Sequence, residues 1–332
     1  MRLSSLFIAG LLLSLVGGSA LGQANDDPPA AQRAEVARRY GLDPTSSLDS
    51  RVRETAAAVL KMFEGLGGPA PTAHVLTKEE RRQLAAAFAA LPPLHRRVLS
   101  ERLRSVSFLD GMPNTALTST VNPGEPFPLL DITIRAAILH QNVSDWLTEK
   151  ERTCFDAAGS PLSVSIEAGK RDALVYVLLH EATHIVDASL RVTPTPLFGE
   201  QPAGITPPTA FTNGVWSERT IPAAPYRDPL RERVRFYIGG ERLAITQATS
   251  VYESLRRTPF ASLYGSSNWH DDLAEYVAVY HWTHVLKQPY RIVIRKEGKE
   301  VFVYEPMKSA LVRSRVDQME RFYENGRQGS TL

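Results

Sequence analysis

The segment KRDALVYVLLHEATHIVDASL, residues 170–190, is long and nearly uniformly apolar. Its length and its lack of glycine and proline predict an α-helix. A helix that is apolar on every face is buried in the middle of a domain. We therefore expect this helix to be covered on all sides by other parts of the chain.

The same helix carries the pattern HExxH, formed by His180, Glu181 and His184. Four residues advance an α-helix by about 6 Å and return to nearly the same face, so both imidazoles can bind one tetrahedral zinc ion. Glu181 is rotated by about 100° and can act as general base on a zinc-activated water. The alternative is a pair of ordinary core histidines, but burying such groups is costly unless something satisfies them. The motif therefore favours a zinc hydrolase.

A catalytic zinc site needs a third protein ligand. The extended pattern of the metzincins has a glycine and a third histidine three and six residues after the second one. Asp187 and Leu190 occupy those positions here, which excludes that class. Asp187 lies one turn beyond His184 and is a candidate for supporting a ligand by a hydrogen bond.

The segment NWHDDLAEYVAVYHWTH, residues 268–284, is the dense cluster of further candidates. Asp271 and Glu275 are four residues apart and share a helix face, so one can bind zinc while the other supports a histidine. Asp272 and His270 stay open as alternative ligands, as does Glu275. His281 and His284 are spaced for a metal as well, but we expect them at the surface or behind the site.

These two segments together resemble a known family. HEATHIVD followed by YGSSNWHDDLAEY is similar to the catalytic core of anthrax lethal factor and its relatives among the gluzincin-type metallopeptidases. The resemblance implies zinc on His180, His184 and Asp271, with Glu181 as base. It also implies that Tyr264 stabilises the oxyanion and that Glu275 supports a histidine.

The sequence departs from the family pattern in two places. The third ligand is an aspartate where the pattern has glutamate, so its helix must approach the zinc more closely. A longer segment separates the two motifs, and the proline-rich residues 191–230 fill it. Neither departure prevents zinc binding.

The rest of the chain predicts an α+β fold. Residues 32–106 show the spacing of successive helices, with a capping box at Thr77 and Glu80. After them we expect strands at 129–139 and 161–169, a helix at 143–155, and hairpins around Gly239-Gly240 and Glu297-Gly298. Helices are expected from Asp271 to about Leu286 and again near the end of the chain, over MKSALVRSRVDQMERFYEN. We therefore predict a helical N-terminal region (23–110) followed by a zincin-like catalytic domain (111–332) with a small mixed sheet, an active-site helix and the proline-rich insertion 191–230.

The first residues predict export. A short positive start, an apolar run at 6–16 and small residues up to Gly22 are typical of a secretory signal peptide, here residues 1–22. Cleavage near Gly22 would leave no stable membrane anchor and a secreted or periplasmic protein. The single Cys154 allows no internal disulfide.

Composition and net charge limit the classes of partner that we expect. Hydrophobic residues make up 43% and charged residues 22%, as in ordinary globular proteins. A formal net charge of +2 gives no electrostatic footprint for nucleic acid. We therefore expect a zinc metallopeptidase acting on a peptide or protein substrate. The alternative is a catalytically weak, zinc-containing binding or interaction protein of the cell envelope.

Overall fold

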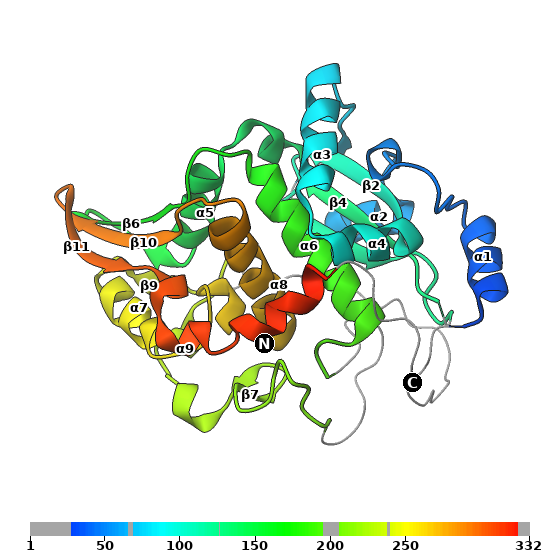
Figure 1. Ribbon diagram of the computed structural model, residues 1–332. Coiled ribbons are helices and arrows are strands. Elements are labelled where there is room, and N and C mark those ends of the chain that lie inside the picture. Colours follow the sequence, from blue (N-terminus) through cyan, green and yellow to red (C-terminus); the bar gives the residue numbers. More distant parts are fainter. Residues whose placement is uncertain (1–27, 66–68, 126, 195–205, 238–239, 325–332) are drawn as a thin grey trace, which may run out of the picture. The chain divides into compact units, whose positions relative to one another are not determined.

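The computed structural model describes residues 28–65, 69–125, 127–194, 206–237 and 240–324. It is a mixed α+β structure of helices and small sheets, which confirms the predicted class (Figure 1). The described residues form two compact units: unit 1 holds 141–180 and 208–321, and unit 2 holds 28–140, 181–194, 206–207 and 322–324. The signal peptide predicted at 1–22 lies outside the described residues, and the domain boundary predicted at 110 stays a prediction.

Unit 2 is built around a four-stranded sheet in the order β1-β2-β4-β3. The central strands β2 and β4 run parallel, and β1 and β3 pair antiparallel at the two edges. The strands are β1 (Thr72–Ala73), β2 (Leu103–Asp110), β3 (Ala116–Thr120) and β4 (Leu130–Arg135). The α-helices are α1 (Ala30–Arg39), α2 (Ala57–Gly65), α3 (Lys78–Ala90) and α4 (Pro93–Arg102), with short 3-10 turns at Leu48–Ser50 and Ala136–His140.

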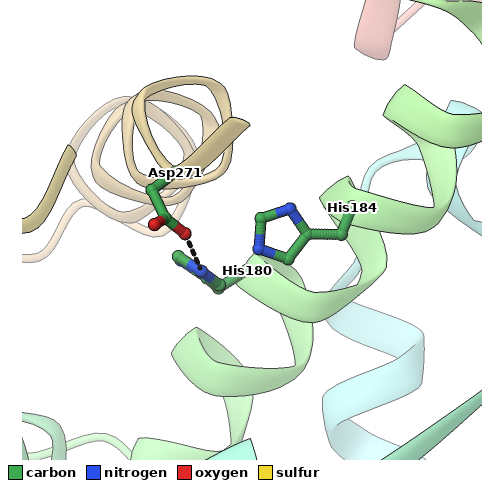
Figure 2. A group of neighbouring side chains, drawn as sticks. All are labelled: His180, His184 and Asp271. Carbon is green, nitrogen blue, oxygen red and sulfur yellow. Dashed lines mark ion pairs between the residues drawn. The ribbon is translucent and has the colours of Figure 1, made fainter. Parts of the chain in front are cut away.

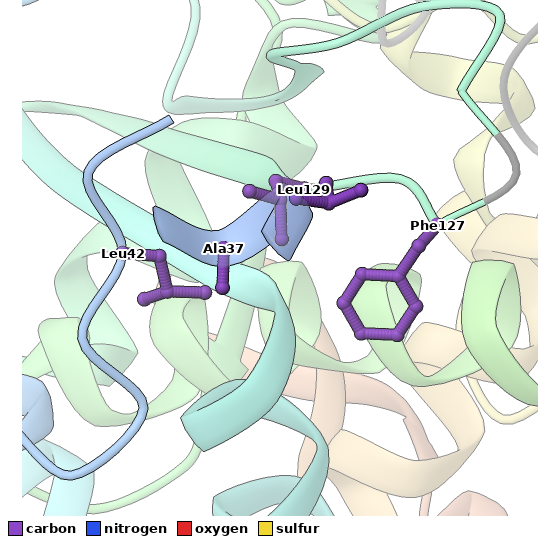
Figure 3. Packing of buried hydrophobic residues seen from close by; sticks show 5 residues of the cluster. Ala37, Leu42, Phe127 and Leu129 are labelled. Carbon is purple, nitrogen blue, oxygen red and sulfur yellow. The ribbon is translucent and has the colours of Figure 1, made fainter. Parts of the chain in front are cut away.

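A small apolar cluster ties α1 to the segment that leads into β4. Ala37 and Leu42 pack with Phe127 and Leu129, each at most 5% exposed (Figure 3). Fully burying a side chain such as leucine or phenylalanine is worth about 1.5–3 kcal/mol. This packing therefore anchors the N-terminal helix of the described chain within unit 2.

Unit 1 contains a three-stranded antiparallel sheet in the order β11-β10-β6. The strands of unit 1, including two further two-stranded pairs, β5-β9 and β7-β8, are β5 (Phe155–Asp156), β6 (Leu162–Glu167), β7 (Trp216–Glu218), β8 (Ile221–Pro222), β9 (Leu243–Ala244), β10 (Arg291–Lys296) and β11 (Lys299–Tyr304). Its helices are α5 (Val143–Arg152), α7 (Ala248–Arg256), α8 (Trp269–Tyr280) with a π-helical end at His281–Val285, and α9 (Ala310–Arg313). Short 3-10 helices lie at Ala224–Tyr226, Arg231–Arg233, Ile245–Gln247, Tyr264–Ser266, Pro306–Lys308 and Val316–Phe322.

The helix α6 (Ala173–Leu190) is one continuous element that belongs to both units. Residues up to His180 count with unit 1, and residues from Glu181 onward count with unit 2. Most of its side chains are buried, as its apolar sequence predicts. Geometry within this helix therefore does not depend on how the two units are placed.

Two stretches predicted as helix are extended or irregular. Residues 103–106 belong to β2, which pairs with β4 in parallel. A strand in the interior of such a sheet is buried on both faces. Residues 51–56 are not helical either, and Val52 forms a parallel bridge with Val106. Strand pairing with residues far along the chain outweighs local helix propensity at both places.

Two further elements differ from the prediction. Residues 238–239 of the hairpin expected around Gly239-Gly240 lie outside the described residues. The flanking segments differ from the prediction: residues 234–237 form no strand, and β9 pairs in parallel with the distant β5. The closing helix is a single α-turn followed by a 3-10 helix. Its break falls near Arg315, whose buried side chain is held by an ion pair with Asp272.

Within the described residues, no helix combines the length and the apolarity needed to cross a bilayer.

Candidate metal centre

The two histidines of the HExxH motif lie one turn apart on α6. His180 and His184 are each 8% exposed. Residues four apart on a helix project from nearly the same face. Since α6 is continuous, the local backbone alone brings the two imidazoles together.

The third member of the group, Asp271, lies on the first turn of α8. The Asn268 side chain caps this helix by accepting hydrogen bonds from the backbone N–H groups of His270 and Asp271, both at 3.0 Å. Its amide also donates to Asp271 Oδ2 at 2.6 Å. The other oxygen, Asp271 Oδ1, lies 3.6 Å from His180 Nε2. The cap therefore fixes which carboxylate oxygen meets the histidine.

The three side chains converge in space (Figure 2). One ligand atom each from His180, His184 and Asp271 can be chosen so that all lie within 4.8 Å of one another. Ligand bonds of about 2.0–2.2 Å in a tetrahedral site place neighbouring ligand atoms about 3.3–3.6 Å apart. The 3.6 Å between Asp271 Oδ1 and His180 Nε2 already matches that spacing. The group could therefore hold a metal ion.

Glu275, one turn after Asp271, contacts the far side of the His180 ring. Its Oε1 lies 3.1 Å from His180 Nδ1, and Tyr176 donates a hydrogen bond to its Oε2 at 3.0 Å. Lys150 Nζ donates to Oε1 at 3.2 Å. Burial raises the pKa of Glu275, but the charge of Lys150 and the hydrogen bond from His180 outweigh it and lower the pKa to about 2. A carboxylate therefore faces the imidazole nitrogen that points away from Asp271.

Glu181 is buried, and another side chain of unit 2 holds its carboxylate. The hydroxyl of Thr118, on β3, donates a hydrogen bond to Glu181 Oε2 at 2.7 Å. A charge-assisted hydrogen bond of this kind fixes the orientation of a carboxylate.

Tyr264 lies in the 3-10 turn before α8 and is 7% exposed. Its ring centroid is 5.9 Å from that of His180, and its ring packs edge-on against Phe236. Lys150 Nζ lies 3.6 Å from the centre of the Tyr264 ring. The tyrosine therefore borders the histidine that contacts Asp271.

The remaining candidates make other contacts. Asp272 is fully buried and accepts hydrogen bonds from Arg315 and from the Trp216 indole. The Trp269 indole donates to His270 Nε2 at 3.1 Å. Asp187 accepts hydrogen bonds from the backbone N–H and the hydroxyl of Thr193, just after α6. His284, in the π-helical segment after α8, stacks on Tyr280.

Sequence reasoning missed Lys150, Tyr176 and Thr118. Lys150 stands in the polar run WLTEKER, where a lysine is normally solvated, and buried lysines are rare. Tyr176 was visible only as one more large residue in an apolar helix. No local pattern marks these side chains, because their role depends on contacts made across the fold.

No family model, no curated protein and no solved structure matches this chain. The function is therefore inferred from the site itself.

Proposed function

We propose that this protein is an exported zinc metallopeptidase with a zincin-like catalytic domain. The observation that carries the proposal is the convergence of Asp271, on α8, with His180 and His184 of α6, the helix that also supplies Glu181. Two imidazoles and one carboxylate form the donor set typical of catalytic zinc, with one ligand position left for chemistry. A bound zinc ion supplies Lewis acidity, which polarises a carbonyl oxygen and makes water more acidic.

The protein side chains divide the remaining work. Glu181 accepts the proton from the attacking water and later passes it to the leaving amine. Its hydrogen bond from Thr118 keeps the carboxylate in one orientation. The Tyr264 hydroxyl donates a hydrogen bond to the developing oxyanion. Glu275 holds the His180 ring through Nδ1, so that Nε2 stays on the side of Asp271.

The strand whose Thr118 contacts Glu181 also has an edge suited to pairing with an extended peptide. Thr118 belongs to β3, an edge strand whose one sheet neighbour among the described residues is β4. The free edge of such a strand can pair with an extended chain through backbone hydrogen bonds. This supports a peptide substrate over a small molecule.

The test is hydrolysis of a broad peptide library by the purified protein. We expect cleavage that a chelator abolishes and added zinc restores. Glu181→Gln removes the base and should lower kcat/KM by about 10²–10⁴-fold while zinc stays bound. Glu253→Gln is the matched control, since this half-exposed glutamate of α7 forms an ion pair with Arg256 and lies outside the candidate site, and it should leave activity unchanged.

Two results would contradict the proposal. One is full activity of Glu181→Gln. The other is zinc binding by the wild-type protein without any cleavage, which would favour the zinc-containing interaction protein instead.

A further inference from the structure

A buried lysine lies behind the candidate metal centre. Lys150, on α5, has a side chain only 5% exposed, and the carboxylate of Glu275 beside it is 1% exposed. Removing a charge from water costs several kcal/mol unless its partners are well placed. A lysine kept in such a position therefore marks a contact that the fold maintains at a cost.

The ammonium of Lys150 contacts two side chains that flank His180. It donates to Glu275 Oε1 at 3.2 Å and lies 3.6 Å from the centre of the Tyr264 ring. A cation over an aromatic face is attracted by the ring, and the attraction is stronger away from water. The tyrosine ring therefore confines the ammonium to the position from which it reaches Glu275.

Glu275 passes this constraint to the histidine. Its Oε1 is shared by Lys150 and His180 Nδ1, and its Oε2 accepts from Tyr176. With both oxygens engaged, the carboxylate has one orientation, and His180 donates to it from Nδ1. A neutral imidazole that donates from Nδ1 offers the lone pair of Nε2 to a ligand. That nitrogen is the one 3.6 Å from Asp271 Oδ1.

We propose that Lys150 is a positioning residue of the metal centre, acting through Glu275 on His180. This inference rests on the proposed metal site but goes beyond the ligands and the base. All its contacts lie within unit 1. It predicts that a side chain touching neither metal nor substrate controls metal affinity.

The experiment measures zinc affinity by competition with a chromogenic chelator, on protein shown to be folded by near-UV circular dichroism. Lys150→Met keeps the length of the side chain and removes its charge, and it should weaken zinc binding by about tenfold or more. Glu275→Gln should weaken it by about 10–100-fold. The double variant should bind within about twofold of Glu275→Gln, because Lys150 acts through the residue already lost.

A matched control separates positioning from packing. Arg231 is another buried cation of unit 1, bound to Ser254 Oγ at 3.2 Å. Arg231→Met should lower the unfolding midpoint and leave zinc affinity unchanged. Should Lys150→Met not fold, Lys150→Gln keeps a hydrogen-bond donor without the charge, and the same loss of affinity is expected.

A spectroscopic measurement gives an independent readout. Co²⁺ bound in place of zinc has visible absorption bands that report ligand geometry. We expect Lys150→Met to shift these bands and Arg231→Met to leave them unchanged.

The outcomes separate this inference from the proposed function. Two outcomes would overturn the role of Lys150 and leave the proposed function standing. One is wild-type zinc affinity with an unchanged cobalt spectrum in folded Lys150→Met. The other is a double variant in which the two losses of zinc affinity multiply. Loss of affinity as predicted, in a protein that cleaves no peptide, would overturn the peptidase and keep the role of Lys150. A wild-type chain that binds no zinc would overturn both.

Discussion

We expect opposite effects from the same substitution at Asp271 and at its neighbour Asp272. Asp271 Oδ1 faces His180 Nε2, whereas Asp272 is held by Arg315 and Trp216. Asp271→Asn should therefore weaken zinc binding by more than about 100-fold, beyond the usual loss for a supporting residue. Asp272→Asn should leave the zinc affinity of the folded protein unchanged. It should instead lower the free energy of unfolding by about 3–5 kcal/mol, because Arg315 stays buried without its carboxylate.

Chelator competition and urea unfolding on the two variants check this pair. A larger loss of zinc affinity in Asp272→Asn than in Asp271→Asn would show that the wrong acid was chosen as ligand.

At the level of residues, the sequence predicts the candidate ligands better than the side chains that hold them in place. The spacing of His180 and His184 determines their geometry once the segment is helical, so a local pattern suffices. Asp271 was one of several acids, and the Asn268 cap and the distance to His180 distinguish it in space. The burial of Lys150 could not be predicted, since a lysine in a polar run becomes buried only through contacts between distant segments.

Elements were predictable where their signals are local. The helix α6 and the hairpin of β10 and β11 follow from apolar patterning and from the turn at Glu297 and Gly298, both of which have positive φ. The strand β2 and the pairing of β9 with β5 were missed, because their partners lie elsewhere in the sequence. Pairing of this kind depends on topology, which single-segment propensity does not contain.

A pH-sensitive contact joins three elements of unit 2. His74, just after β1, bonds to Asp110 at the end of β2 at 3.1 Å and to Glu80 on α3 at 3.3 Å. Burial lowers the pKa of His74, but these two acids outweigh it and raise the pKa above the usual 6.5. Protonated His74 is therefore favoured by folding. The stability it contributes is fully present below about pH 6.5 and is lost as pH rises through the folded-state pKa.

Urea unfolding on either side of this range checks the contact. His74→Gln should reduce the fall in stability between acid and mildly alkaline pH. His140→Gln is the control: this exposed imidazole also lies 3.3 Å from Glu80, and its removal should leave the contribution of His74 in place. An identical pH dependence in wild type and His74→Gln would refute the assignment.

At the scale of the whole molecule, composition and charge predict classes of protein rather than a particular one. An ordinary globular composition predicts an ordered chain, and the absence of a nucleic-acid partner, expected from the net charge of +2, stays a prediction. The α+β class was correct, but the division into two units that share α6 was not visible in the sequence. One helix contributes to both units and also carries the two histidines, so folding and the candidate site depend on the same element.

Native mass spectrometry of the purified chain and its variants tests the central claim most directly, since it counts the metal ions on each folded molecule. We predict one zinc per chain for the wild type and for Glu181→Gln, and no retained zinc for His184→Ala. A wild-type chain that takes up no zinc at neutral pH, or a His184→Ala variant that retains it as the wild type does, would contradict the account.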